Sequence, residues 1–271
     1  MSLANRIKTS TVKEGKIIIN YGSPGCGKTS MWCQAKDAIL IEAKDNSASA
    51  LKEIGSIRED LPVIQTSDWN DSLNILKSIV DEDHSYRNII IDGLSGLDEY
   101  CNEITISEDC EGSADKFTAF GRGESLAGIK WMELVQTLRD IKSKGVWVYM
   151  LAHSQIITVN NPSGSNYVRY APACGKVKLA QILKFSDAIL YSTFVTATTE
   201  VNKESGKGKG VGGEKRVMYT SPSASFESKN RLNLPIIIDL GNSPQESFSA
   251  FANAAKSGRV QKSVDNEKKV S

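Results

Sequence analysis

The sequence has little that could build a metal or disulfide framework. Among its 271 residues are only two histidines and five cysteines, and no two cysteines have C-x-x-C spacing. The histidines, His84 and His153, lie too far from the cysteines along the chain to indicate a zinc site. An odd, dispersed set of cysteines indicates reduced thiols in a cytoplasm-like compartment.

Long apolar runs and a net charge of one sign are also missing. An apolar stretch such as Val146–Ala152 is far shorter than the roughly 20 residues that cross a bilayer. Residues 1–8 have no apolar core, so we expect no secretory signal, no membrane contact and a cytoplasmic location. The formal net charge is +1, so any contact with nucleic acid must come from a local patch.

What the sequence does contain is an alternation of strand-like and helix-like segments. This alternation is typical of a parallel sheet with helices on both faces. We expect an N-terminal extension at 1–13, one α/β domain at 14–256 and a disordered tail at 257–271. The expected strands are Lys16–Tyr21, Ala38–Glu42, Pro62–Thr66, Asn88–Asp92, Val146–Ala152, Ala188–Val195 and Pro235–Leu240.

Three segments are rich in polar residues and glycine. Residues 107–123 and 158–175 are predicted to be loops, because Asn, Ser, Pro and Gly interrupt regular structure. Two β-type segments flank a lysine-rich and glycine-rich tip at 203–213, which predicts a β-hairpin over residues 194–220.

The most specific motif is Gly22–Thr29 (GSPGCGKT), which matches G-x-x-x-x-G-K-[ST] between a predicted strand and a predicted helix. The glycines let the backbone curl so that its N–H groups face phosphates, and the helix adds its positive end. Lys28 is expected to reach the β- and γ-phosphates of ATP, and Thr29 to ligate Mg²⁺. The expected nucleotide-binding residues are Gly22, Ser23, Pro24, Gly25, Cys26, Gly27, Lys28, Thr29 and Ser30.

Asp92 is the second element of this predicted site. It ends the buried strand I-I-I-D, which is the position of a Walker B aspartate that holds Mg²⁺ together with Thr29. Two strands fit between the two motifs, which indicates that the Asp92 strand is not next to the P-loop strand in sequence order. This resembles the class of P-loop ATPases with an inserted central strand and a catalytic glutamate, and not the GTPases or nucleotide kinases.

Four further segments follow in the order found in one family. Ile39–Asp45 resembles the strand after the P-loop helix of RecA-like ATPases, and Val148–Gln155 resembles their sensor strand. Ile182–Tyr191 and Lys229–Arg231 (KNR) resemble elements of RadA and the DnaB-type helicases. Over residues 14–240 the sequence is most similar to phage-encoded RecA/RadA-like ATPases of the single-strand annealing and recombination type.

This resemblance implies an α/β fold with a RecA-like P-loop core. Its mostly parallel central sheet would be flanked by helices and decorated by the β-hairpin. Where the family carries a catalytic glutamate, this sequence has Lys44. A carboxylate is needed to orient the attacking water, so either Glu42 or Asp45 would do this, or hydrolysis is slow.

The resemblance also implies roles for residues further along the chain. His153 or Gln155 would sense the γ-phosphate, because ligands bind at the carboxyl ends of the strands in open α/β sheets. Lys229 and Arg231 would reach the γ-phosphate of a neighbouring subunit. The implied assembly is a homo-oligomer with ATP at its subunit interfaces.

Single-stranded DNA is the partner that the resemblance implies. Basic residues interleaved with aromatic ones suit phosphate neutralisation and base stacking. The candidates are Tyr167, Arg169, Tyr170, Lys176, Lys178, Lys207 and Lys209. Two alternatives stay open: a helicase- or loader-type ATPase motor, and a low-turnover nucleotide-binding scaffold in phage replication, which would act in the bacterial cytoplasm.

Overall fold

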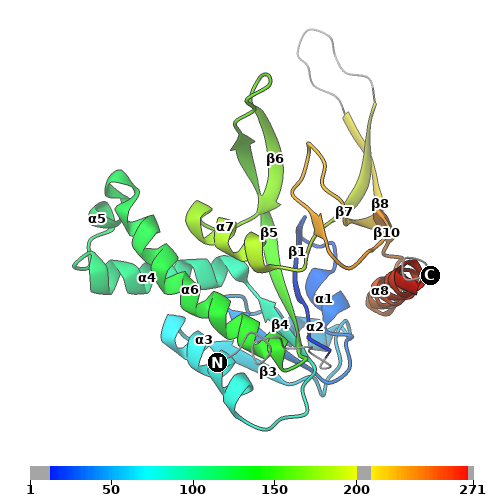
Figure 1. Cartoon of the computed structure of the whole chain (residues 1–271), viewed down its shortest axis with the longest axis horizontal. Helices are drawn as coiled ribbons and strands as arrows, with labels where there is room; N and C mark the ends of the chain where they lie inside the picture. Colours follow the sequence, from blue (N-terminus) through cyan, green and yellow to red (C-terminus); the bar gives the residue numbers. More distant parts are fainter. Residues whose placement is uncertain (1–12, 200–208, 268–271) are drawn as a thin grey trace.

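The computed structural model of the protein describes residues 13–199 and 209–267, and its centre is a ten-stranded sheet (Figure 1). The strands are β1 Ile17–Gly22, β2 Ala38–Ala43, β3 Val63–Thr66, β4 Asn88–Asp92, β5 Trp147–Val159, β6 Tyr167–Pro172, β7 Ala188–Thr199, β8 Lys209–Tyr219, β9 Lys229–Asn230 and β10 Ile237–Asp239.

The main sheet has the order β10-β8-β7-β1-β5-β4-β2-β3. All neighbours from β3 to β7 are parallel, and β8 and β10 add antiparallel pairs at one edge. The predicted α/β fold with a mostly parallel sheet is confirmed, and β5 is the strand inserted between β1 and β4. The parallel strands have their carboxyl ends on the same side of the sheet. Gly22, Asp92 and His153 therefore come together there.

Helices cover both faces of this sheet (Figure 1). Side chains of α3, α4, α6 and α7 form one buried cluster with the sheet, and side chains of α1, α2 and α8 form the other. The helices are α1 Lys28–Trp32, α2 Ala48–Glu53, α3 Trp69–Asp81, α4 Leu94–Asp109, α5 Ala114–Thr118, α6 Arg122–Ser143, α7 Lys176–Phe185 and α8 Pro244–Glu267, and a 3₁₀ turn, η2, spans Ala119–Gly121.

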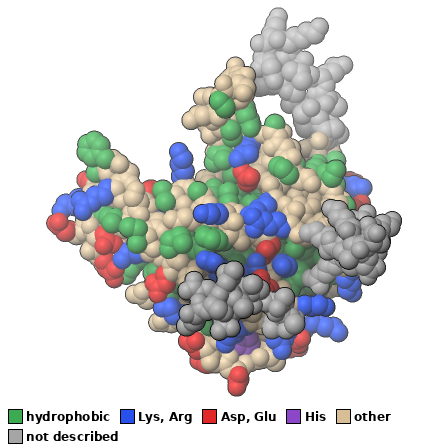
Figure 2. Space-filling view, in the orientation of Figure 1, with side chains coloured by type: hydrophobic (Ala, Val, Ile, Leu, Met, Phe, Trp, Pro, Cys, Tyr) green, Lys and Arg blue, Asp and Glu red, His purple; other side chains and the backbone are tan. Residues whose placement is uncertain are grey.

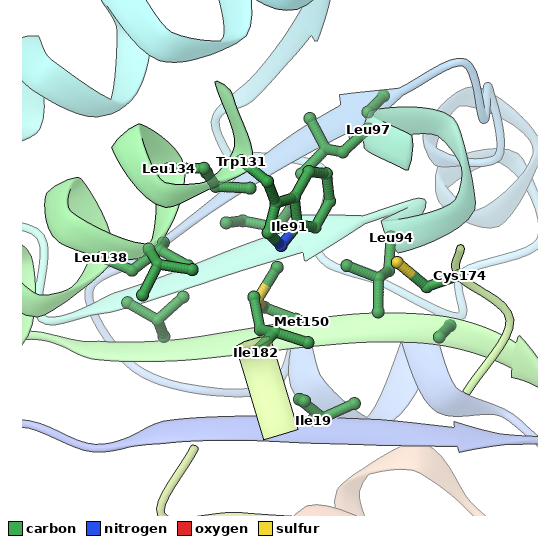
Figure 3. Close-up of a cluster of buried hydrophobic side chains, with 14 of the residues drawn as sticks. Ile19, Ile91, Leu94, Leu97, Trp131, Leu134, Leu138, Met150, Cys174 and Ile182 are labelled. Atoms are coloured by element: carbon green, nitrogen blue, oxygen red, sulfur yellow. The ribbon is translucent and has the colours of Figure 1, made fainter. Parts of the chain in front are cut away.

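Trp131 of α6 anchors the larger cluster (Figure 3). Its ring is fully buried and stacks on Trp69 of α3 with 5.6 Å between ring centroids. Leu134 and Leu138 continue the same stripe of α6 along the sheet. An indole of this size removes a large apolar area from water, so α6 fixes the position of β4 and β5 beneath it.

The segment 158–175, predicted to be a loop, forms an arm instead. β5 runs on to Val159, and β6 returns antiparallel with Tyr170 opposite Ile156. β-Branched and aromatic residues on both sides of the turn stabilise strands more than the turn's Asn, Pro and Gly disrupt them. The hairpin at 194–220 is confirmed as β7 and β8, and both arms project from the sheet in the same direction (Figure 1).

Two other segments are helical where irregular chain was expected. Residues 107–123 contain the end of α4, all of α5 and the 3₁₀ turn, and the hydroxyl of Ser113 caps α5 by accepting from the N–H of Lys116. Within the predicted tail, α8 continues to Glu267. Residues 1–12, 268–271 and the segment 200–208 that contains Lys207 lie outside the described residues.

Lys178 was expected to contact DNA, and its position in the core makes this wrong. It is fully buried, its amine lies 2.8 Å from the carboxylate of Asp98 and 3.9 Å from that of Glu124, and it donates to the side-chain oxygen of Asn102. α7 places it on the face that meets α4 and α6, where only a paired charge is tolerated. Lys178 therefore ties the base of the β5–β6 arm to these two helices.

Lys178→Ala is expected to lower the free energy of unfolding by about 3 kcal/mol, because it leaves Asp98 without its cation in a nearly dry site. Urea denaturation measures the change. Lys176→Ala is the matched control, since Lys176 lies two residues earlier on α7 and is exposed. Equal stability of the two variants would contradict the structural role of Lys178.

Candidate functional site

The loop between β1 and α1 has the backbone that phosphate binding requires. Gly25 and Gly27 adopt φ angles of 75° and 82°, in the left-handed region that glycine enters without strain. At Gly22 a β-carbon would lie 1.7 Å from the carbonyl oxygen of Ser192 on β7, so only glycine fits. The predicted glycines are therefore needed for the conformation of the loop itself.

Lys28 and Thr29 begin α1 and point to two different partners. The amine of Lys28 donates to the carbonyl oxygens of Gly22 (3.2 Å) and Ser23 (3.0 Å), which hold it across the loop. The hydroxyl of Thr29 donates to the carboxylate of Asp92, with 2.6 Å between the oxygens. The structure thus joins the two predicted motifs through one hydrogen bond.

A cavity of about 530 Å³ opens over this loop. It falls within the size range of small-molecule sites. Its wall combines the loop with residues of β4, β5 and β8 and with residues that directly follow β2 and β10. The polar and charged lining residues include Lys28, Thr29, Ser30, Asp45, Ser47, Asp92, His153, Arg216 and Asn242.

The two candidate carboxylates for water activation are in different environments. Glu42 is buried, and its Oε1 accepts from the backbone N–H groups of Ser47 (2.8 Å) and Ala48 (2.9 Å), so it caps α2. Asp45 lines the cavity. Lys44 has a φ of 62°, and its amine forms an ion pair with Glu99 on α4. The Lys44 side chain therefore does not occupy the place of Asp45 at the cavity wall.

The two sensor candidates also separate. His153 is exposed and lines the cavity, and its Cα pairs with that of Gly22 across the sheet. Gln155 is not among the cavity-lining residues. Its side-chain amide donates to the carbonyl oxygens of Pro172 and Cys174, both at 2.9 Å, and holds the return of the arm.

Lys229 and Arg231 lie at the far end of the sheet from the cavity, where the parallel strands begin. β9 pairs with the start of β7, and the amine of Lys229 donates to the carbonyl oxygens of Leu183 (2.8 Å) and Lys184 (3.1 Å) at the end of α7. The N–H of Arg231 donates to the carbonyl of Asp187. They do not line the cavity of their own subunit, and their role in a neighbouring subunit stays a prediction.

Residues 14–232, well over half of the chain, match the model of a protein family described as an AAA domain (AAA_24). This chain belongs to that AAA-domain family. No curated protein matches the sequence. Family membership supports a P-loop ATPase domain and nucleotide binding, and the match extends across β1, β4, β5 and the K-N-R element.

The oxygen ligands of this AAA domain suit Mg²⁺. Mg²⁺ prefers carboxylate, hydroxyl, phosphate and water oxygens and is bound through few protein ligands. Thr29 and Asp92 would supply two, and no cluster of three His, Cys, Asp or Glu side chains that could hold a metal occurs among the described residues. Burial raises the pKa of Asp92, the hydrogen bond from Thr29 lowers it, and the nearby charges of Asp45 and Glu42 raise it. A bound cation would offset the repulsion among these three carboxylates.

Sequence reasoning missed the far wall of the AAA-domain cavity. Arg216 of β8 lines it together with Asn242 and Pro244, which follow β10. No motif marks these positions. They lie more than 180 residues after the phosphate-binding loop in the sequence, and the antiparallel strands β8 and β10 bring them to the cavity. Gly93 was also missed: a β-carbon there would lie 2.3 Å from the carbonyl oxygen of Ala43, so glycine lets β2 and β4 end side by side.

The predicted DNA-contacting residues of the AAA domain differ in exposure and in pairing. Tyr167 and Tyr170 are exposed on the β5–β6 arm, and Lys176 is exposed at the start of α7. Arg169 is ion-paired with Glu227. Lys209 begins β8. Among the helices of the described residues, none has the length and apolar character to span a membrane.

Proposed function

We propose that this AAA domain hydrolyses Mg²⁺-bound ATP and uses the nucleotide state to control single-stranded DNA bound to its arms. One observation carries the proposal. β5 is a single strand of 13 residues that passes the cavity at His153 and continues as one side of the β5–β6 arm. The nucleotide site and the arm thus share one rigid element.

The residues around the cavity have distinct proposed roles in hydrolysis. Lys28 would exchange the carbonyls of Gly22 and Ser23 for phosphate oxygens. Asp45 would orient the attacking water and accept its proton. Thr29 and Asp92 would hold Mg²⁺, which supplies positive charge to the transferring phosphoryl group. His153 would contact the γ-phosphate from the end of the apolar half of β5.

The second arm is also rooted beside the phosphate-binding loop. The N–H of Ser23 donates to the carbonyl of Ser192 (3.2 Å), and the hydroxyls of Ser23 and Thr193 lie 3.2 Å apart. Both contacts are to β7, which continues into the β7–β8 hairpin. Ordering of the loop by ATP would therefore reach both arms through strands that run past the loop and continue into the arms.

Single-stranded DNA is the proposed ligand of the β5–β6 arm. Tyr167 and Tyr170 are 37% and 41% exposed, and bases stack favourably on such rings. Figure 2 shows hydrophobic side chains along this arm above a surface that carries Lys and Arg side chains. Exposed rings and the exposed Lys176 suit binding of a single strand, with Lys176 as a phosphate contact, and strand annealing or recombination is the proposed biological task.

Tyr167→Ala is expected to weaken binding of a labelled oligothymidylate about 10-fold, the effect of losing one stacked base. Fluorescence anisotropy at low salt, with and without a non-hydrolysable ATP analogue, measures it. Phe120→Ala is the matched control, because Phe120 is a fully exposed aromatic residue on η2. Binding that is undetectable in the unaltered protein, or weakened equally by both variants, would contradict the DNA proposal.

A further inference from the structure

Arg216 faces the phosphate-binding loop from the side opposite Asp92. In the sheet, β8 lies two strands from β1 in one direction, and β4 lies two strands from β1 in the other. The cavity therefore has an acidic wall made by Asp45 and Asp92 and a cationic wall made by Arg216, with Lys28 between them. A polyanion bound with its metal on the acidic side would extend toward the cationic side.

The guanidinium of Arg216 is held in a fixed orientation. Its Nε and Nη2 both donate to the carbonyl oxygen of Gly241, at 3.2 Å and 2.9 Å. This two-point attachment directs Nη1 to the loop, where it lies 2.7 Å from the place that a β-carbon of Gly27 would occupy. Gly27 thus leaves room for a cation directly over the backbone that precedes Lys28.

We propose that Arg216 binds the part of the nucleotide that ATP and ADP share, the α- and β-phosphates. Thr29 and Asp92 would hold the metal beside the terminal phosphate on the acidic wall, so the remainder of the nucleotide would lie toward Gly27 and β8. An arginine in that place holds substrate and product alike. This inference rests on the proposed function, because it requires that the cavity binds a nucleotide.

Arginine suits this position better than lysine. A guanidinium presents its donors in a planar fork, so one side chain holds the Gly241 carbonyl and still offers Nη1 to a phosphate oxygen. The Gly241 carbonyl precedes α8, so the same side chain fixes the wall formed by Asn242 and Pro244. Arg216 is therefore a binding residue that also shapes its own side of the cavity.

The test compares dissociation constants for Mg-ADP and for a non-hydrolysable Mg-ATP analogue by titration calorimetry. Arg216→Gln keeps an amide donor for the Gly241 carbonyl and removes the charge. It is expected to weaken both nucleotides by about 10-fold or more, and by similar factors, because it loses a charge-assisted hydrogen bond that both make. In turnover, KM for ATP should rise while kcat changes little.

Two further variants complete the design. Lys215→Ala is the matched control: Lys215 is the preceding residue on β8, is exposed and pairs with Asp239. It should leave both dissociation constants unchanged. Arg216→Lys keeps the charge and should recover part of the affinity, which a purely structural role would not predict.

Three outcomes would overturn the assignment. Unaltered ADP affinity in a folded Arg216→Gln protein would show that the side chain does not touch the nucleotide. A loss confined to the ATP analogue would assign Arg216 to the γ-phosphate instead. A loss in Lys215→Ala of the same size would reduce the effect to a general electrostatic one. Failure of the unaltered protein to bind either nucleotide would refute the proposed function itself, before any variant is compared.

Discussion

Lys28→Ala is expected to abolish nucleotide binding, with a loss of about 100-fold or more in affinity for Mg-ATP and no measurable ATP turnover. The amine of Lys28 lies across the loop, where it donates to the carbonyls of Gly22 and Ser23 and to the sulfur of Cys26, and a methyl group replaces none of its charge. Calorimetric titration with a non-hydrolysable analogue and a phosphate-release assay measure the two losses.

The fold should survive this change. α1 begins after Gly27, whose left-handed backbone does not depend on the lysine side chain. An unchanged thermal melting curve would show this. Lys36→Ala is the matched control, since Lys36 is an exposed lysine that follows α1 and does not line the cavity. Retained ATP affinity in Lys28→Ala would refute the assignment of the phosphate-binding loop.

Asp45→Asn is expected to lower kcat for ATP hydrolysis about 100-fold while nucleotide affinity changes little. The amide fills the same volume at the cavity wall but cannot accept a proton from water. Steady-state turnover and analogue titration separate the two quantities. Asp45 is the carboxylate that the structure favours, because its alternative is occupied elsewhere.

Glu42→Gln is the matched control for that experiment. Its remaining side-chain oxygen still accepts from the N–H groups that begin α2, so kcat should be retained. The loss of a charged cap should cost about 1 kcal/mol of unfolding free energy. A collapse of kcat in Glu42→Gln alone would reverse the assignment. Equal, near-zero rates in both variants and in the unaltered protein would favour the nucleotide-binding scaffold.

The sequence predicted the parts of the site that depend on local chemistry. A loop that must enter left-handed backbone needs glycines at fixed spacing, so the phosphate-binding motif was readable directly. Asp92 was predicted because it ends a buried strand at the position of a Walker B aspartate, and the structure places it against the hydroxyl of Thr29. The presence of two strands between the P-loop strand and the Asp92 strand in the sequence was predicted from the room between the two motifs.

The remaining features depend on packing between distant segments. Whether Glu42 or Asp45 faces the cavity is decided by the N-terminus of α2, which accepts one of them as its cap. Lys178 is of a residue type usually found at the surface, and it is buried here because α4 and α6 bring Asp98, Asn102 and Glu124 to its amine. Arg216 enters the site through antiparallel strands added at the edge of the sheet. None of these pairings leaves a trace in residue spacing.

The side chain of Gln155 has a mechanical consequence for the arm. It holds β5 to the carbonyls of Pro172 and Cys174 just beyond the cavity, so Gln155 is the point about which the arm would pivot. Four residues of β5 extend past it to Val159, a lever of about 13 Å at the rise of a β-strand. A small tilt of β5 at His153 would therefore displace the tip of the β5–β6 arm. The stiffness of the hairpin would set how much of the tilt reaches the tip.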